Sequence, residues 1–332
     1  MQRRNLMLSG AGLLAAGAAM PAAAQAVTRW DISIPWGPSE FHTINAARFA
    51  REAAAVTNNQ VLMTVHAGGS LGVRANESVR AVADGVVPMA EFASFQNIGE
   101  IPILGIDALP FLISSQAELR IMSDLIRPIW AAELARRGVT PLYMVPWPTQ
   151  NLYFKRPVAN AAELRGIRMR TMDRNTTEMS SRLGMVGQQL NNPDVVPALA
   201  SGRVDAVMTS ATTAVAQRYW EFLRYAYTTN HLWATNMMVV STEALRRLSP
   251  AHRTAITELA TKLEPEFWAV AQAEHETRAA ELRANGMTVE APPEALIAPM
   301  REATRTMIDD FIRTNPAAGP VITEFRRRVG RV

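Results

Sequence analysis

Ser70 stands in a pattern that could make it a catalytic nucleophile. Residues 68–72 read GGSLG, which fits the G-x-S-x-G turn that holds the nucleophile of many serine hydrolases. In those enzymes a helix begins directly after the serine, so that backbone N–H groups face the developing oxyanion. Here residues 72–74 separate Ser70 from Asn76, the first residue suited to cap a helix. The spacing therefore favours a glycine turn over a nucleophile.

No other stretch carries a motif for catalysis or for a metal or cofactor. Cysteine is absent, which excludes disulfides, zinc–thiolate sites and cysteine nucleophiles. The five histidines stand singly, without the spacing of a metal-ligand motif. A base and an orienting acid for the serine would have to come from residues without a local signature, namely His231, His252, His275, Asp194 and Asp205. We expect a protein that is not an enzyme and that has no cofactor and no metal; a serine hydrolase using Ser70 is the alternative.

Two arginines alternate with apolar residues in the second half of the chain. Residues 167–170 read IRMR, and a strand there would turn Arg168 and Arg170 to the face away from the core. Arg170 would stand at the carboxyl end of that strand, where open α/β sheets bind ligands. A guanidinium pairs with a carboxylate through two parallel N–H donors. The pattern by itself leaves two alternatives open, an anion site or a solvated strand face.

Strand and helix patterns alternate around these residues. Period-two alternation and turn residues predict strands at 30–34, 60–66, 87–92, 143–145, 167–170, 204–208 and 237–240. Helical patterns fall between them, at 46–54, 76–83, 176–183 and 193–201, with Asn76 as the expected cap of the second. Such alternation is typical of a parallel sheet covered by helices. The 332 residues are enough for two domains, each with its own core.

The longest predicted helix opens at Ser249–Pro250 and ends at Asn285–Gly286. Serine suits the N-cap and proline the first turn. Apolar residues recur at helical spacing along one face: Ile256, Leu259, Leu263, Phe267 and Val270. At 1.5 Å per residue the helix would be about 50 Å long. That is longer than one small domain needs, so we expect it to span two.

The N-terminal residues have the features of an export signal. A positive start, MQRR, precedes the apolar stretch 6–20, and residues 24–26 offer an A-x-A cleavage site. The paired arginines leave Sec and twin-arginine export both open. We therefore expect a signal peptide at 1–26, cleaved near Ala26, and a periplasmic product. The formal net charge of +4 includes arginines of this segment, and we expect no nucleic-acid partner.

Several motifs, taken in order, resemble those of the solute-binding subunits of tripartite ATP-independent periplasmic (TRAP) transporters. They are LG at 71–72, ADG at 83–85, GIDALPFL at 105–112, KRPV at 155–158, ELRGIRMR at 163–170, VVPALASGRVD at 195–205, NH at 230–231, VVS at 239–241 and LS at 248–249. The resemblance covers essentially the whole chain after the signal. It implies an α/β, two-lobe periplasmic-binding-protein-like fold with parallel or mixed sheets and a long helix bracing both lobes.

The resemblance also implies how the chain divides and what it does. The first lobe would be 27–147 plus 235–275, and the second 148–234 plus 276–332. A protein of this family is non-catalytic: it captures a small organic acid and delivers it to the TRAP membrane subunits. We expect a monomer in that role. An extracytoplasmic ligand-sensing module would use the same fold and remains a second alternative.

The same resemblance suggests the binding residues. Arg170 occupies the position of the family's carboxylate-binding arginine. The chain departs from the family at Thr209, where an asparagine is frequent, and at Asn192, where an aromatic residue is frequent. Sialic-acid-binding relatives have a second arginine near Gln150 and a ligand-facing glutamate near Phe92. With Trp36 on a first-lobe loop, this implies a pocket with one cation, neutral polar groups and aromatic walls.

The export signal gives a first testable prediction. Protein recovered from the periplasm should begin at Val27, because cleavage is expected after the A-x-A site. N-terminal sequencing or intact-mass measurement checks this. A periplasmic protein that still carries Met1 would show that the segment is not a cleaved signal.

Overall fold

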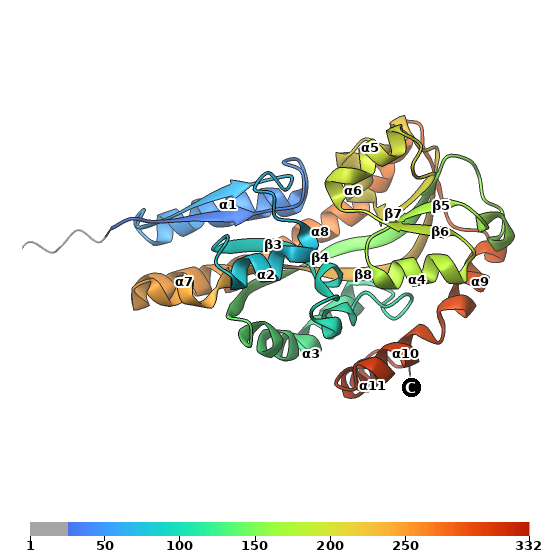
Figure 1. The fold of residues 1–332 in the computed structure, drawn as a ribbon. Coiled ribbons are helices and arrows are strands. Elements are labelled where there is room, and N and C mark those ends of the chain that lie inside the picture. The colour runs from blue at the N-terminus through green and yellow to red at the C-terminus, as the bar shows by residue number, and fades with distance from the viewer. Residues whose placement is uncertain (1–25, 332) are drawn as a thin grey trace, which may run out of the picture.

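The computed structural model describes residues 26–331 (Figure 1). The predicted signal peptide, 1–26, lies outside the described residues apart from Ala26. Within the described range, every helix is too short or too polar to cross a lipid bilayer.

A nine-stranded mixed sheet forms the centre of the molecule, in the order β2-β1-β3-β8-β4-β7-β5-β6, with β9 beside β8. The strands are β1 Thr28–Ser33, β2 Val61–His66, β3 Met89–Ala93, β4 Val139–Phe154, β5 Arg168–Thr171, β6 Val186–Gln189, β7 Ala206–Ser210, β8 Tyr225–Ser241 and β9 Thr288–Glu290. β1 is parallel to β2 and β3, and β5 is parallel to β6 and β7. Each half of the chain thus contributes a small parallel group, which is the core of one lobe.

The antiparallel strands β4 and β8 join the two groups (Figure 1). β8 pairs with β3 through residues 236–240, and β4 pairs with β7 through residues 150–154. The sequence pattern predicted only short parts of these strands, although they are 16 and 17 residues long. Both are buried along nearly their whole length, so they lack the alternation that marks a strand with one solvated face.

Helices pack around this sheet. They are α1 Phe41–Val56, α2 Ser78–Ala83, α3 Gln116–Ala135, α4 Arg174–Arg182, α5 Val195–Ala200, α6 Ala211–Ala216, α7 Thr242–Arg247, α8 Pro250–Ala284, α9 Glu294–Thr304, α10 Met307–Thr314 and α11 Ala318–Arg328. α8 is the long helix predicted from the sequence, and the Ser249 hydroxyl accepts a hydrogen bond from the His252 N–H at its start. It contacts α1 in the first half of the chain and α6 in the second. The two-lobe fold with a bracing helix is confirmed.

The start of α2 differs from the prediction. A 3₁₀ turn at Ala75–Glu77 precedes the helix, and the Asn76 side chain does not cap it. Asn97 takes this role: its Oδ1 accepts from the Val79 N–H at 3.4 Å and its Nδ2 donates to the Ala75 carbonyl at 3.0 Å. The helix start is therefore tied to a residue distant in sequence, which a local capping pattern cannot reveal.

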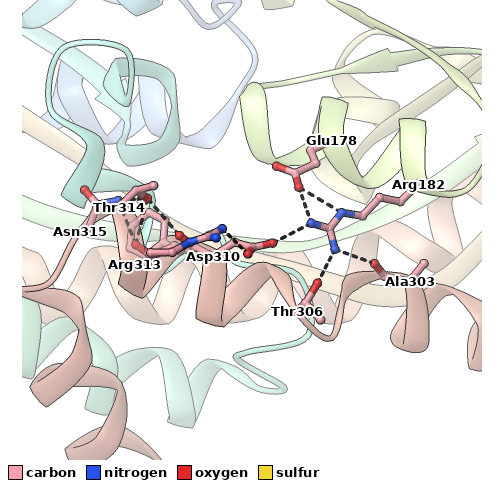
Figure 2. A network of polar contacts seen from close by, with 9 residues as sticks. Glu178, Arg182, Ala303, Thr306, Asp310, Arg313, Thr314 and Asn315 are labelled. Atoms are coloured by element: carbon pink, nitrogen blue, oxygen red, sulfur yellow. Dashed lines mark hydrogen bonds and ion pairs between the residues drawn. The ribbon is translucent and has the colours of Figure 1, made fainter.

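The C-terminal helices connect the two lobes. Phe311 of α10 and Phe325 of α11 share a core cluster with α3 of the first lobe, and α11 contacts α3 (Figure 1). Figure 2 shows how the C-terminal helices are also attached to α4 of the second lobe. Arg182 of α4 donates to the Ala303 carbonyl, to Thr306 and to Asp310. The apolar faces of α10 and α11 are thus buried in a core cluster with α3, while Arg182 of α4 also binds α10.

The glycine segment after β2 is a turn, as the spacing predicted. Gly68, Gly69 and Gly72 have φ angles of +66°, +70° and +74°. The N–H groups of Gly68 and Gly69 donate to the carbonyls of Trp36 and Ile34, at 2.7 and 2.9 Å. Ser70 is exposed at the tip of this turn. The segment thus holds the loop that follows β1.

This turn gives a stability prediction. Gly68→Ala should lower the free energy of unfolding by about 1–2 kcal/mol, because an L-residue is strained at positive φ. The added Cβ meets no atom within 4 Å, so the loss would report backbone strain alone. Gly37→Ala is the matched control, since its surroundings are equally open and its φ is not positive. Urea unfolding should separate the two variants; equal stability would contradict the argument.

Candidate functional site

A small cavity lies between the two lobes, at the carboxyl ends of their parallel strands. Its lining residues are Trp36, Phe95, Gln96, Trp147, Gln150, Arg170, Met172, Asn192, Thr209 and Thr213. The loops after β1, β3 and β5 supply Trp36, Phe95 and Met172, as expected for open α/β sheets. The cavity volume is about 20 Å³, which is room for roughly one water molecule. The cavity is therefore too small to hold an organic molecule in this arrangement of the lobes.

Most residues predicted for the site gather here. Those that line the cavity are Trp36, Gln150, Arg170, Asn192 and Thr209. Phe92 does not reach it, because its side chain is fully buried in the core cluster that also contains α3. Phe95 and Gln96 line the cavity instead, in the 3₁₀ turn Ser94–Asn97 where the chain leaves the sheet. The expected contribution of Phe92 is thus replaced by residues just beyond the strand.

Arg170 brings a buried positive charge to the cavity. Its side chain is 5% exposed. Nε and Nη2 donate to the Leu190 carbonyl at 3.2 and 3.0 Å, and Nη1 donates to the Met208 carbonyl at 2.9 Å. A guanidinium has five N–H donors, so these three bonds leave two. Burial lowers the pKa of Arg170, but an arginine in a protein stays protonated.

The two arginines of β5 have opposite surroundings. Arg168 is bound by Asp205 through two hydrogen bonds, of 2.7 and 2.8 Å, and its side chain is 45% exposed. Across residues 26–331, by contrast, no carboxylate lies within ion-pair distance of Arg170. Arg168 therefore forms a surface ion pair, while Arg170 is a buried cation with donors to spare. That difference favours Arg170 as the anion-binding residue.

Neutral polar groups surround the cation. The Gln150 Nε2 donates to the Pro148 carbonyl at 2.8 Å, which directs its oxygen elsewhere as an acceptor. The Gln96 Oε1 accepts from the Ala93 N–H at 2.9 Å, which leaves its amide N–H₂ as a donor. Thr209 adds a hydroxyl from β7. The site therefore presents one charge together with both donors and acceptors.

Aromatic side chains form one wall. Trp36 and Trp147 meet edge to face, with ring centroids 4.8 Å apart. The Trp147 Nε1 donates to the Asn236 Oδ1 at 3.1 Å, and the Asn236 amide donates to the buried carboxylate of Glu91. His42 lies 3.1 Å from that carboxylate, and burial lowers the pKa of its imidazole. This polar chain behind the wall holds Trp147 in place.

A second buried carboxyl, Glu40, contacts two of the residues that line the cavity. It precedes α1 in the first lobe, and it accepts from Asn192 at 2.7 Å and from Thr213 at 3.1 Å in the second. Burial raises the pKa of Glu40 to about 7. Sequence patterns alone did not indicate Glu40, Trp147, Met172 or Thr213 as site residues. The rule that placed Arg170 at a strand end would also have indicated Met172, which follows β5, but Glu40 has no local signal.

The sequence matches one family of known proteins along most of its length. Residues 32–315 match the model for bacterial extracellular solute-binding proteins of family 7. An uncharacterized protein of Sinorhizobium fredii, y4mM, is 29% identical over 259 residues, which are 74% of this chain. The chain spans only 46% of the length of that relative.

Solved structures with the same fold extend the comparison. DctP7 of Bordetella pertussis, an extracytoplasmic solute receptor that binds pyroglutamic acid, is 30% identical with a TM-score of 0.88. The alignment covers 91% of this chain and 100% of that receptor. A TRAP solute-binding protein from a marine metagenome, specific for pyroglutamate, is 28% identical with a TM-score of 0.87 and covers 91% and 99% of the two chains.

Proposed function

Because the chain belongs to family 7 of the bacterial extracellular solute-binding proteins, we propose that it is a periplasmic receptor that captures a small organic acid and delivers it to TRAP membrane subunits. It acts by binding and closing, without catalysis and as a monomer. The exposed position of Ser70 in a glycine turn gives no support to the hydrolase alternative.

The observation that carries the proposal is the state of Arg170. A buried guanidinium is costly unless it is paired, and among residues 26–331 its hydrogen-bond acceptors are all backbone carbonyls. Two N–H donors are left, and a carboxylate offers two acceptor oxygens in matching geometry. Binding an acid would therefore satisfy both the remaining donors and the charge.

The rest of the cavity supports a monocarboxylate with a small ring. Trp36 and Trp147 offer apolar area, while Gln96, Gln150 and Thr209 offer neutral hydrogen-bonding groups. A second cation that could pair with another carboxylate is absent from the cavity lining. Pyroglutamate has one carboxylate and a five-membered lactam, and two structural relatives bind it. We take pyroglutamate as the first ligand to test.

The lobes proposed from the sequence suit this role if α10 and α11 are taken as a bridge between them. The first comprises 27–147 plus 235–275, and the second 148–234 plus 276 to about the end of α9; α10 and α11 bridge them. Arg170, Thr209 and Asn192 then come from the second lobe, and Trp36 from the first. A ligand held by both would draw the lobes together.

Substitutions of the two β5 arginines test the binding role. Arg170→Ala should weaken pyroglutamate binding by roughly 30-fold to several thousand-fold, because loss of one partner of a buried charged pair costs about 2–5 kcal/mol. Arg170→Lys keeps the positive charge but loses the planar pair of N–H donors, so its affinity for pyroglutamate should fall less than that of Arg170→Ala. Thr209→Val should lie between the parent and Arg170→Ala, since a neutral hydrogen bond contributes about 1 kcal/mol.

Arg168→Ala is the matched control and should bind like the parent, because Arg168 is held by Asp205 at the surface. Isothermal calorimetry gives the ranking, and circular dichroism checks that each variant folds. A parent-like affinity of Arg170→Ala, or a greater loss in Arg168→Ala, would overturn the assignment.

Lobe closure can be measured independently of affinity. The Glu40 bonds cross from the first lobe to the second, and the cavity they enclose is too small for entry. The free protein should therefore sample open forms, and pyroglutamate should shift it towards the closed one. Small-angle scattering should show a smaller radius of gyration at saturation. Superimposable curves with and without the ligand would argue against closure.

A further inference from the structure

Glu40 terminates a chain of hydrogen bonds that runs in one direction. The Tyr219 hydroxyl donates to the Gln217 Oε1 at 2.9 Å, and the Gln217 amide donates to the Asn192 Oδ1. The Asn192 Nδ2 then donates to the Glu40 Oε1 at 2.7 Å. Each amide has its oxygen used as an acceptor and its nitrogen as a donor, so Glu40 is the acceptor at the end.

The second oxygen of Glu40 determines how Thr213 faces the cavity. The Thr213 hydroxyl donates its single proton to the Glu40 Oε2 at 3.1 Å. A hydroxyl has one donor and two acceptor sites, so only acceptor sites are left. The Ser210 hydroxyl lies 3.5 Å away and takes up one of them. Thr213, which lines the cavity, therefore presents an acceptor to whatever binds there.

We propose that Glu40 is a positioning residue for specificity: by holding the Thr213 proton, it makes the site select acids that carry an N–H or O–H donor as well as a carboxylate. This rests on the proposed function, in which Arg170 binds the carboxylate. Glu40 itself is bonded to protein groups on both oxygens and acts through Thr213.

A glutamine at position 40 would reverse this polarity. Its Oε1 can still accept from Asn192, but its Nε2 can only donate to the Thr213 oxygen. The Thr213 proton is then free to turn towards the cavity, and the site presents a donor instead. Glu40→Gln keeps size and shape, so the change in ligand preference reports hydrogen-bond direction rather than packing.

Protonation of Glu40 should have the same effect as this substitution. Burial raises the pKa of Glu40 to about 7. Above that value the ionised carboxylate accepts from both partners; below it the added proton can be donated to Thr213. The charged and titratable groups that act on Glu40 are Arg170 on β5, Glu274 on α8, which is paired with Arg278, and Tyr219. Arg170 stays protonated, and burial raises the pKa of Tyr219.

The experiment compares two acids that differ in one group: pyroglutamate and the corresponding lactone, 5-oxotetrahydrofuran-2-carboxylate, in which a ring oxygen replaces the N–H. At pH 8 the parent protein should prefer the lactam roughly tenfold, as expected for one hydrogen bond. The preference should shrink towards pH 5.5, where both ligands are still carboxylates. In Glu40→Gln it should be lost or reversed, and it should not change with pH.

Two further variants keep the test decisive. Thr213→Val removes the hydroxyl without changing shape and should abolish the preference even if Glu40→Gln fails to fold. Glu52→Gln, on the helix that follows Glu40 and in a partly exposed pair with Arg48, should leave it unchanged. An unchanged lactam preference in Glu40→Gln or Thr213→Val would overturn this inference. Equal binding of both acids by the parent would also overturn it while leaving carboxylate capture intact, whereas failure of both acids to bind would overturn the proposed ligand class as well.

Discussion

Arg170 carries a positive charge into a cleft where its side chain is 5% exposed, and the surrounding elements are arranged around that charge. Two carbonyls, from Leu190 after β6 and from Met208 in β7, hold the guanidinium in one orientation. Arg170 lines a cavity to which both lobes contribute residues. Because a buried cation without a carboxylate partner is unfavourable, the carboxylate of the proposed ligand would supply the partner that Arg170 lacks among residues 26–331.

Two other carboxyl groups, Asp107 and Asp173, are also buried and depend on hydrogen bonds from the protein. Burial raises the pKa of Asp107 to about 7 and that of Asp173 to about 6. Asp107 accepts from Ser94 and from the Thr235 N–H, each at 2.8 Å, and so ties β8 to the turn that carries Phe95 and Gln96. These carboxyl groups lose their hydration on folding, and their hydrogen bonds position neighbouring elements. Their desolvation is offset by hydrogen bonds that only the folded chain can supply.

Motion and recognition are linked through the same contacts. α8 and the strands β4 and β8 link the lobes through the chain, and the Glu40 bonds to Asn192 and Thr213 add a side-chain link between them. If the lobes open as proposed, the Glu40 carboxyl would act both in closure and in the hydrogen-bonding character of the cavity. A ligand that matches this character stabilises the closed form, which is how differential affinity shifts a two-state equilibrium.

Local pattern was enough to predict the short parallel strands, the cap and length of α8, and the place of Arg170 at a strand end, because these depend on neighbours in the chain. It could not distinguish Arg170 from Arg168, since the difference lies in Asp205, 37 residues away, which binds only one of them. The family resemblance placed Phe92 in the pocket, but the side chain belongs to a core formed with α3. Local pattern could not find Glu40, whose partners are 152 and 173 residues distant. The order of motifs in the sequence was by itself enough to determine the family and the two-lobe fold. Which groups are buried, paired or left free was decided by long-range packing, because burial and hydrogen-bond partners exist only once the two lobes have folded against each other.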